Sequence, residues 1–430
     1  MAERLPATLR AYRRLSAAAA PLSPLVLNHR LRRGKEDAGR MAERRGESGL
    51  PRPQGPLVWM HGASVGEMLA IIPLVDRIRA RGFNVLVTSG TVTSAELAGR
   101  WLPAGAIHQF VPLDAPRFVT RFLDHWRPGL ALIAEADLWP NMIMECATRG
   151  VPLILVNGRL SERSYSRWRR APAMIAAMLE RFDLCLAQSP HDAERYTQLG
   201  APRVGLTGNL KLDVPAPPAD TAKLAAVRDA VDGRPLIVAA STHPGEEAAV
   251  IDAHRRLRES FPGLLTVVVP RHPERGAGII DIADVAGLPA VMRSRGYLPD
   301  GGIEIYVADT IGELGLMYRL AQIVFMGGSL VRHGGQNPIE AAKLGAAILH
   351  GPHVWNFADI YAALDEARGA EEVADAGKLT VRIGALLTDA ALRETVAEAA
   401  LKTVEILGGA LDRTLAAIDP YLMQLRLEQR

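Results

Sequence analysis

Two acidic residues in the first half of the chain follow apolar runs, at places where a carboxylate could act as a base. Glu67 ends the segment HGASVGE, which follows the apolar run 56–60 and precedes a segment with helical spacing. Glu135 begins the segment EADLWPN, directly after the apolar run 130–134. A carboxylate placed there can accept a proton from a substrate hydroxyl. The alternative is an ordinary acid near the start of a helix, which the helix dipole favours.

The second half carries residues suited to bind phosphate. Arg271 follows a valine-rich run, and its guanidinium suits fork-like recognition of phosphate or carboxylate. Glycine-rich segments between 327 and 335 lead to Asn337 and Pro338, a typical N-cap and first residue of a helix. Free backbone N–H groups there predict an anion site. Glu340 could bond a ribose hydroxyl or reach back to Asn337 in a capping box.

Other polar residues of the first half are expected beside the two acids. Lys211 lies in the loop 208–211 after another apolar run, and Ser64 and Gly66 share the turn that ends at Glu67. Loops that follow parallel strands lie at one edge of a sheet, where ligands bind. We therefore treat Lys211 as part of the same site and Ser64 and Gly66 as candidates for acceptor contacts.

Motifs for several other chemistries are missing from the sequence. No GxxxxGK[ST] segment occurs, and no GxGxxG follows an apolar run, which argues against a P-loop and a dehydrogenase. Cys146 and Cys185 are the two cysteines, and no cluster has metal-ligand spacing. A phosphate binder in one half and an acid-bearing site in the other predict metal-independent transfer of a sugar from an activated nucleotide. We expect no cofactor and no nucleic-acid partner.

The elements that must position these residues are apolar runs that alternate with helical patterns. Continuous apolar strands of this kind predict parallel sheets covered on both faces. The predicted strands are 57–60, 84–89, 107–111, 130–134, 153–157, 184–188, 204–207, 236–240, 264–269, 290–293, 303–307, 323–326 and 347–350. The sequence thus predicts two doubly wound α/β domains in tandem with a ligand cleft between them, and a helical tail at 379–422.

The proline-rich segment 214–220 is the best domain boundary in the sequence. It separates a first domain at 36–213 from a second at 221–430, and a basic leader at 1–35 precedes both. The leader holds thirteen mostly apolar residues at 15–27 between arginine clusters, too few to span a bilayer. It is either a flexible leader or an amphipathic segment that lies on an anionic membrane surface.

Several long motifs closely resemble those of the 3-deoxy-D-manno-octulosonic acid (Kdo) transferases. The matching segments are HGASVGE, EADLWPN, GNLK, STHPGEE, PRHPER, GGSLVRHGGQNPIEAA and GPHVWNFADI, in order along the chain. The resemblance implies the GT-B fold, with two Rossmann-like domains facing a central cleft and C-terminal helices that return to the first domain. It implies an inverting transferase that moves Kdo from CMP-Kdo to the lipid A precursor, peripheral or monotopic at the cytoplasmic face of the inner membrane.

The resemblance also implies roles for single residues. Glu67 matches the general base, and Glu135 and Lys211 match positions that stabilise the transition state. The residues that match CMP-binding segments are Pro270, Arg271, Ile311, Gly312, Glu313, Asn337, Pro338, Ile339 and Glu340. Two residues beside the last of these segments, Arg332 and Gln336, depart from the usual family pattern of proline and histidine.

Two alternatives to a Kdo transferase remain open at this point. Another GT-B nucleotide-sugar transferase or an epimerase would share the architecture and the phosphate-binding loops. A two-lobed solute-binding protein would share the two domains, and it would need an export signal, which the leader does not resemble. Binding of CMP separates the last alternative from the others.

Overall fold

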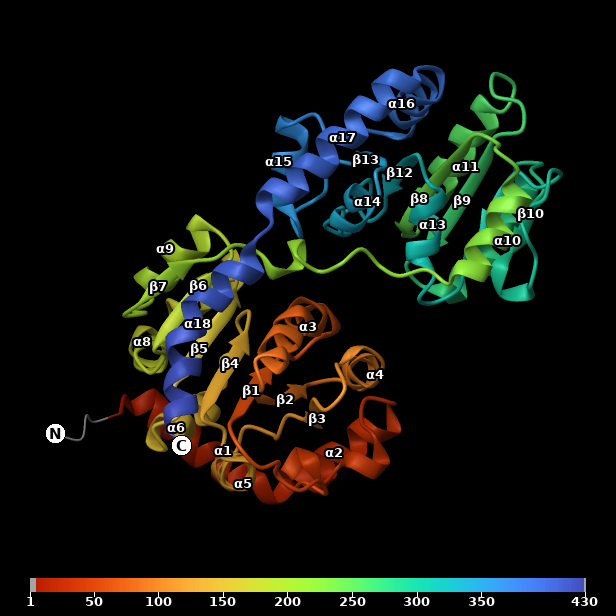
Figure 1. Cartoon of the computed structure of the whole chain (residues 1–430). Coiled ribbons are helices and arrows are strands. Elements are labelled where there is room, and N and C mark those ends of the chain that lie inside the picture. Colours follow the sequence, from red (N-terminus) through yellow and green to blue (C-terminus); the bar gives the residue numbers. More distant parts are fainter. Residues whose placement is uncertain (1–4, 429–430) are drawn as a thin grey trace. The chain divides into compact units, whose positions relative to one another are not determined.

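The computed structural model describes residues 5–428, and it divides the chain into two compact units (Figure 1). The first unit comprises Met1–Val214 and Leu407–Arg430, and the second comprises Pro215–Ile406. Within the described residues each unit contains one seven-stranded sheet in which all neighbouring strands are parallel. The predicted fold class, two doubly wound parallel α/β units in one chain, is confirmed.

The first sheet has the strand order β3-β2-β1-β4-β5-β6-β7. Its strands are β1 (Leu57–His61), β2 (Asn84–Ser89), β3 (Ile107–Phe110), β4 (Leu130–Ala134), β5 (Leu153–Gly158), β6 (Leu184–Ala187) and β7 (Val204–Leu206). Its helices are α1 (Ala7–Ala19), α2 (Ser23–Arg32), α3 (Val65–Ala80), α4 (Val92–Trp101), α5 (Pro116–Trp126), α6 (Pro140–Thr148), α7 (Glu162–Trp168), α8 (Pro172–Leu179), α9 (Pro190–Gln198) and α18 (Ala410–Leu427).

Both faces of the first sheet are buried, which explains why its strands are continuously apolar. Successive side chains of a strand point to opposite faces. Leu57 and Trp59 of β1 accordingly join the core formed with α5, α6, α8 and α9. Val58 and Met60 join the core on the other face, formed with α3, α4 and α18 (Figure 1).

The last helix of the chain, α18, completes the first unit. Ile418 and Leu422 are buried against the sheet on the face that α3 also covers. The Asp213 carboxylate accepts hydrogen bonds from the backbone N–H groups of Gly409 (2.7 Å) and Leu411 (2.6 Å). Because Asp213 ends the first stretch of this unit, these bonds join the two parts of the chain that form it.

The N-terminal helices α1 and α2 also belong to the first unit. Leu9 is fully buried against Met144 and Ala177. Tyr12 Oη donates to the Asp114 carboxylate (3.0 Å), and Arg13 forms an ion pair with Glu145 (2.8 Å). The predicted separation of residues 1–35 as a leader is therefore wrong for residues 5–35, and residues 1–4 lie outside the described part.

The second sheet has the strand order β10-β11-β9-β8-β12-β13-β14. Its strands are β8 (Leu236–Thr242), β9 (Leu265–Pro270), β10 (Ala290–Met292), β11 (Ile305–Val307), β12 (Ile323–Met326), β13 (Ala347–His350) and β14 (Ala370–Glu372). Its helices are α10 (Thr221–Val231), α11 (Glu246–Leu257), α12 (Gly276–Val285), α13 (Leu314–Leu320), α14 (Ile339–Lys343), α15 (Ala358–Glu366), α16 (Ala376–Thr388) and α17 (Ala390–Leu407). Strand β14 was not predicted.

The predicted second domain, 221–430, extends too far at its C-terminal end. The helical tail breaks at Asp389 and again at Gly408–Gly409, where Gly409 adopts a left-handed backbone (φ 79°). Helices α16 and α17 pack on the second sheet through Leu379, Ile383 and Val396. Only α18, beyond the second break, belongs to the first unit, as the returning C-terminal helix was expected to do.

Each sheet reverses its direction of winding at one pair of strands. The reversal lies between β1 and β4 in the first sheet and between β8 and β12 in the second. The loops after two such strands run to opposite faces of the sheet and leave a crevice at its carboxyl edge, where ligands bind in doubly wound proteins. These two reversal points are therefore where each unit is expected to bind a ligand.

Candidate active site

The two predicted carboxylates lie at the reversal point of the first sheet. Strands β1 and β4 are direct neighbours, with His61 opposite Ile133. Glu67 lies in the first turn of α3, after β1, and Glu135 immediately follows β4. Ser64 is the N-cap of α3, and its hydroxyl accepts the backbone N–H of Glu67 (3.3 Å). The topology thus brings together two acids that are far apart in the sequence.

Glu67 is half-buried and has few hydrogen-bond donors. One carboxylate oxygen accepts the Ala63 backbone N–H (2.6 Å), and the other accepts the Ser64 hydroxyl (3.1 Å). Burial raises the pKa of Glu67, and the negative charge of Glu135 raises it further. Glu67 is consequently a stronger proton acceptor than a solvated glutamate, and it needs a higher pH to be ionised.

Glu135 is paired with the predicted lysine. Lys211 Nζ lies 2.7 Å from Glu135 Oε1, although 76 positions separate them in the chain. A short 3-10 turn, Leu210–Leu212, holds the lysine, and Leu210 packs against Ala70 of α3 and Ala410 of α18. A Cβ atom added at Gly66 would lie 3.9 Å from Lys211 Nζ, an ordinary van der Waals contact, so the turn before Glu67 borders the lysine.

Glu135 itself has a left-handed backbone (φ 57°), which is uncommon for residues other than glycine. Asn157, at the end of the neighbouring strand β5, is also left-handed (φ 54°) and buried. Its side-chain oxygen accepts the backbone N–H of Leu210 (2.9 Å). Strain of this kind concentrates at functional sites, and here it lies at the ends of two neighbouring strands, at Glu135 and at the residue that binds the Lys211 turn.

A chain of buried polar groups lies next to the two acids, and it was not predicted from the sequence. His61 Nε2 lies 2.7 Å from an Asp137 carboxylate oxygen, and His61 Nδ1 lies 2.8 Å from Thr88 Oγ1. Trp59 Nε1 donates to the same Thr88 hydroxyl (2.9 Å). His61 and Asp137 lie in the same two sequence segments as Glu67 and Glu135, so they could have been noticed. Their roles could not be inferred from the sequence, because these depend on hydrogen-bond partners that only the fold reveals.

These contacts fix the direction of each hydrogen bond for a neutral His61. Burial opposes ionisation of Asp137, but hydrogen bonds from His61 and Trp139 outweigh it and lower the pKa of Asp137. The ionised carboxylate can only accept, so His61 Nε2 carries the proton. His61 Nδ1 then accepts the Thr88 hydroxyl proton, and Thr88 accepts from Trp59. Trp59 donates and Asp137 accepts at the two ends of the chain, while Thr88 and His61 each accept one hydrogen bond and donate one.

The reversal point of the second sheet is occupied by a side chain of the protein itself. The Glu246 carboxylate is 1% exposed and accepts backbone N–H groups from Gly328 (2.6 Å), Ser329 (2.9 Å) and Leu330 (2.9 Å). It also accepts the backbone N–H of His243 (2.9 Å). An internal carboxylate therefore binds the N–H groups of the first glycine-rich segment, and they are not free to bind an anion.

Close packing, rather than ligand binding, explains the glycine at position 327. A Cβ atom added there would lie 2.5 Å from the Ser241 carbonyl oxygen, which is closer than side chains allow. The loop after β12 can therefore approach the end of β8 only with glycine at this position. Together with Glu246, this contact joins the two loops at the reversal point.

The predicted anion-binding helix start is also weaker than the sequence suggested. Helix α14 spans only Ile339–Lys343, and Pro338 is its N-cap rather than its first residue. Asn337 precedes the cap, and its side chain accepts the backbone N–H of Ile339 (3.1 Å). Burial raises the pKa of Glu340, and a hydrogen bond from the Asn337 side chain opposes this rise. Glu340 thus interacts with Asn337, as in one of its two predicted roles, but through the side chain.

Arg271 is exposed directly after β9, and within residues 5–428 its guanidinium has no ion pair or hydrogen bond. A small group of histidines lies near it. The His243 ring lies 3.8 Å from that of His333 and 6.2 Å from that of His272. Burial and the positive charges of these neighbours lower the pKa of His243 to about 4, so it is neutral near pH 7. Gln336, one of the two departures from the family pattern, approaches His243 (3.1 Å).

The predicted residues Ile311, Gly312 and Glu313 follow β11, on the same edge of the second sheet. Ile311 is 83% exposed. Glu313 forms ion pairs with Arg293 and with Lys223 (2.8 Å), and the Arg293 hydrogen bond is the main reason that the pKa of Glu313 falls to about 2. The Glu313 carboxylate is therefore engaged inside the second unit, whereas Ile311 and Gly312 are exposed and open to a ligand.

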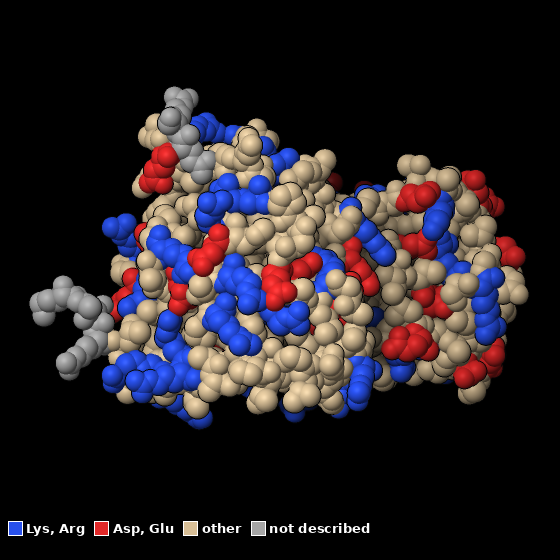
Figure 2. Space-filling view, turned by 90° about the horizontal axis from the view of Figure 1, so that it is seen from below, with Lys and Arg blue, Asp and Glu red and all other residues tan. Residues whose placement is uncertain are grey.

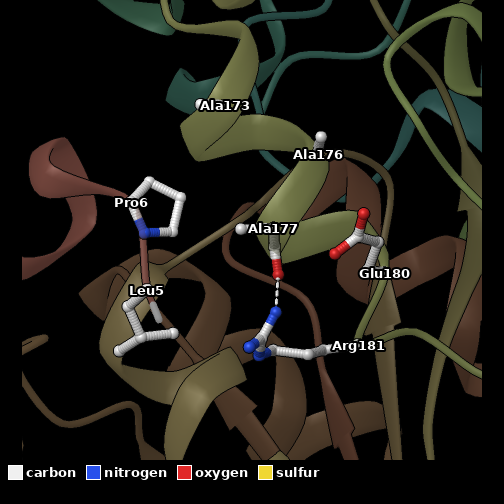
Figure 3. Close-up of a pocket in the computed structure, with 7 residues that line it drawn as sticks. All are labelled: Leu5, Pro6, Ala173, Ala176, Ala177, Glu180 and Arg181. Carbon is white, nitrogen blue, oxygen red and sulfur yellow. Dashed lines mark hydrogen bonds between the residues drawn. The ribbon is translucent and has the colours of Figure 1, made fainter. Parts of the chain in front are cut away.

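A separate pocket of about 240 Å³ lies between the start of α1 and α8 (Figure 3). It is lined by Leu5, Pro6, Ala173, Ala176, Ala177, Glu180 and Arg181. Arg181 follows α8, and its guanidinium turns back to the Ala177 carbonyl of that helix. None of the predicted site residues contributes to this pocket.

Two further kinds of feature are absent from residues 5–428. No group of three or more histidine, cysteine, aspartate or glutamate side chains there is arranged to hold a metal ion. No helix in the same residues is long and apolar enough to span a membrane.

Comparison with known proteins places the chain among sugar transferases. A family model described as 3-deoxy-D-manno-octulosonic-acid transferase (kdotransferase) matches residues 36–214. The 3-deoxy-D-manno-octulosonic acid transferase of Haemophilus influenzae is 35% identical over 392 residues, which cover 89% of this chain and 91% of the relative.

Solved structures share the fold at much lower identity. A glycosyltransferase from Rickettsia africae aligns with a TM-score of 0.59 at 12% identity, over 87% of this chain and 99% of that one. The UDP-GlcNAc 2-epimerase from Neisseria meningitidis aligns with a TM-score of 0.60 at 12% identity, over 86% of this chain and 100% of that one.

Two doubly wound parallel units in one chain give this protein the GT-B fold, which the glycosyltransferase and the epimerase above share. The fold alone does not identify the family. The Haemophilus relative does, because its 35% identity extends over nearly the whole of both chains. The chain belongs to the 3-deoxy-D-manno-octulosonic acid transferase family, as its motifs indicated.

Proposed function

We propose that this protein transfers Kdo from CMP-Kdo to a glucosamine hydroxyl of the lipid A precursor, with inversion at the anomeric carbon. The observation that carries the proposal is the half-buried Glu67 carboxylate, with its raised pKa, beside the Glu135–Lys211 pair at the reversal point of the first sheet. The acceptor oxygen attacks the anomeric carbon of Kdo while the bond to the CMP phosphate breaks. The hydroxyl proton passes to Glu67, and CMP leaves with the bonding electrons.

The neighbours of Glu67 suggest how it performs this step. The Ala63 N–H and the Ser64 hydroxyl hold the carboxylate in place, which is the geometric requirement for a general base. Lys211 neutralises Glu135 in the ground state and supplies a positive charge close to the reacting groups. Preorganised charges of this kind often make the largest contribution to catalysis.

We place the donor on the second unit, with Arg271 as the main contact to the CMP phosphate. Its guanidinium is exposed at the carboxyl edge of the sheet, without a partner of its own among the described residues. Ile311, exposed on a nearby strand end, would cover an apolar face of the nucleotide. Pro270, Gly312, Asn337, Pro338 and Ile339 shape the surrounding loops. Lys211 and Arg271 supply positive charge in the roles that a metal ion has in other transferases, so the proposed reaction needs no cofactor.

We further propose that α1 and α2 hold the protein on the cytoplasmic face of the inner membrane. Leu15, Leu22, Leu25 and Val26 of this region are each more than half exposed. Lys and Arg side chains are numerous on the face seen in Figure 2. Exposed apolar side chains among cations suit an anionic membrane surface, to which each nearby Lys or Arg adds about 1 kcal/mol of binding.

Vesicle sedimentation tests the membrane contact. Changing Leu15, Leu22 and Leu25 together to asparagine should weaken partition onto anionic vesicles, while CMP affinity stays normal. Val285→Asn is a matched control, because Val285 is 91% exposed on the second unit. Equal partition of the triple variant and the wild type, with or without high salt, contradicts a membrane role for these helices.

A transfer assay tests the proposed reaction directly. The full chain is incubated with CMP-Kdo and lipid A precursor, and the product is examined by mass spectrometry and by NMR of its anomeric linkage. We expect a product heavier by Kdo, an inverted linkage and equal activity with and without a metal chelator. Release of free Kdo without transfer, or retention of configuration, contradicts the proposal.

A further inference from the structure

Trp139 differs from the other aromatic residues near Glu67 and Glu135 because its side chain is exposed. It follows Glu135 in the loop after β4 and is 41% exposed, although the adjacent Leu138 and Pro140 are buried. It is also the N-cap residue of α6, so its backbone is fixed by the start of that helix. The exposed ring is therefore held in one place and is available to contact a substrate at the catalytic loop.

The orientation of the Trp139 ring is set by the buried polar chain beneath the site. Its indole N–H donates to the Asp137 carboxylate, which also accepts from His61 Nε2 (2.7 Å). His61 is fully buried and bonded to Thr88, and Thr88 is bonded to Trp59 of the same strand. The ring is thus tied to the core of the sheet through its one polar atom, and its open surface is entirely apolar.

The charges around Trp139 indicate what the ring binds. Asp137 is close enough to Glu67 for its charge to raise the pKa of that residue, and so is Glu135, which is paired with Lys211. An apolar ring next to carboxylates and an ammonium group is complementary to a hexose, which has an apolar C–H face and polar hydroxyl groups. The C–H face of a sugar ring packs on the indole, and its hydroxyls reach the polar groups.

We propose that Trp139 is the stacking platform for the acceptor sugar, and that Asp137, supported by His61, is a positioning residue that aims it. This inference rests on the proposed function, since it takes the sugar beside Glu67 to be the acceptor. The sugar ring lies on the indole with a hydroxyl directed at Glu67. Asp137 acts through Trp139 and does not itself contact the reacting atoms.

Tryptophan fluorescence tests the contact without any need for turnover. The probe is the de-acylated lipid A precursor, a water-soluble glucosamine disaccharide, titrated into the full chain. We expect a saturable emission change in the wild type and in Trp101→Phe, a control at another half-exposed tryptophan (44% exposed), and none in Trp139→Phe. The same change in Trp139→Phe as in the wild type overturns the platform. Because this assay needs no donor, it gives its answer even if the protein transfers a sugar other than Kdo.

Steady-state kinetics then separates binding from chemistry. Trp139→Ala should raise the KM for acceptor by roughly two- to twelvefold, the range for one aromatic contact, with CMP affinity unchanged. Trp139→Phe should keep most of the wild-type affinity, because the platform survives. An acceptor KM in Trp139→Ala equal to that of the wild type overturns the proposal.

A double-mutant cycle tests the positioning role of Asp137. Asp137→Ala should raise the acceptor KM in the wild-type background and leave it unchanged in the Trp139→Ala background, because the two residues act through one contact. Asp137→Asn keeps an oxygen for the indole N–H and should retain a nearly normal acceptor KM. Equal effects of Asp137→Ala in both backgrounds overturn the positioning role, and the melting temperature of each variant shows whether the fold is kept.

Discussion

Each unit of this protein has a glutamate in the first turn of the helix that follows a strand at its reversal point, but the two carboxylates have different surroundings. Glu67 lies in the first turn of α3, after the strand that borders the reversal of the first sheet. Glu246 lies in the first turn of α11, after the corresponding strand of the second sheet. Glu67 accepts one backbone N–H, whereas Glu246 accepts four.

The number of donors explains the different properties of the two carboxylates. Each backbone N–H stabilises the charged form and removes a lone pair from use. The Glu246 carboxylate is consequently fully engaged by backbone donors, and it shapes the loops of the second unit. Glu67 keeps lone pairs free, and its charge is opposed by burial and by Glu135, so it can gain a proton. A glutamate at a strand end is therefore a candidate base only where the surrounding backbone leaves it unsatisfied.

The largest effect is expected from Glu67→Gln. The amide keeps the shape of the side chain but cannot take the proton, so turnover should fall by about 10²–10⁴. CMP affinity should stay normal, because the proposed donor contacts lie on the second unit. Glu162→Gln, which alters a first-turn acid of α7, is the matched control. Turnover above about a tenth of the wild type, outside the range for a lost base, would move the base elsewhere, with Glu135 the next candidate.

The same variant should not lose stability. A carboxylate whose pKa is raised in the folded protein stabilises the fold below its unfolded pKa, and this contribution is lost as pH rises through the folded pKa. At neutral pH the neutral amide therefore removes a charge that the fold disfavours. We expect a melting temperature equal to or above that of the wild type, and a clear decrease would show that Glu67 has a structural role.

Glu246→Gln should have the reverse outcome. The amide nitrogen cannot accept backbone N–H groups, so buried donors lose a charged acceptor, at about 1.5–3 kcal/mol for each such bond. We expect a lower melting temperature, measured by calorimetry, and no such change for Glu274→Gln, whose side chain is 76% exposed. An unchanged melting temperature for Glu246→Gln would remove the distinction between the two glutamates.

Arg271→Ala tests the assignment of the donor to the second unit. Loss of a hydrogen bond to a charged phosphate should weaken CMP binding by about 1.5–3 kcal/mol, as measured by calorimetric titration. Arg295→Ala, at another exposed arginine of this unit, should bind CMP normally. Normal CMP affinity in the Arg271 variant would place the phosphate site elsewhere.

The smallest expected effect is a shift in pH dependence. Glu135→Gln removes a negative charge that raises the pKa of Glu67 and leaves Lys211 without its partner. Both changes lower the pKa of Glu67, so the base stays ionised to lower pH. The acidic limb of kcat/KM, measured on the residual activity, should move towards lower pH. A limb that stays in place or moves higher would show that another group titrates there.

The sequence predicted the strands of this protein well because they are continuously apolar. Strands β2, β4, β12 and β13 begin and end at the predicted residues. Strand β14 (Ala370–Glu372) was missed, since three residues with two acids carry no apolar run. The N-terminal helices were misjudged as a leader, because arginine-rich composition does not reveal that Leu9 is buried or that Arg13 has a partner 132 positions away.

The sequence by itself determined the parallel sheets and the positions of Glu67 and Glu135 at strand ends, because both follow from residues that are adjacent in the chain. The tertiary structure decided which glutamate is left with free lone pairs, which carboxylate Lys211 neutralises, and which sheet α18 covers. These outcomes depend on contacts between segments far apart in the chain. A local pattern can specify a strand and the loop after it, but only the assembled fold brings a particular N–H or ammonium group within 3 Å of a particular carboxylate.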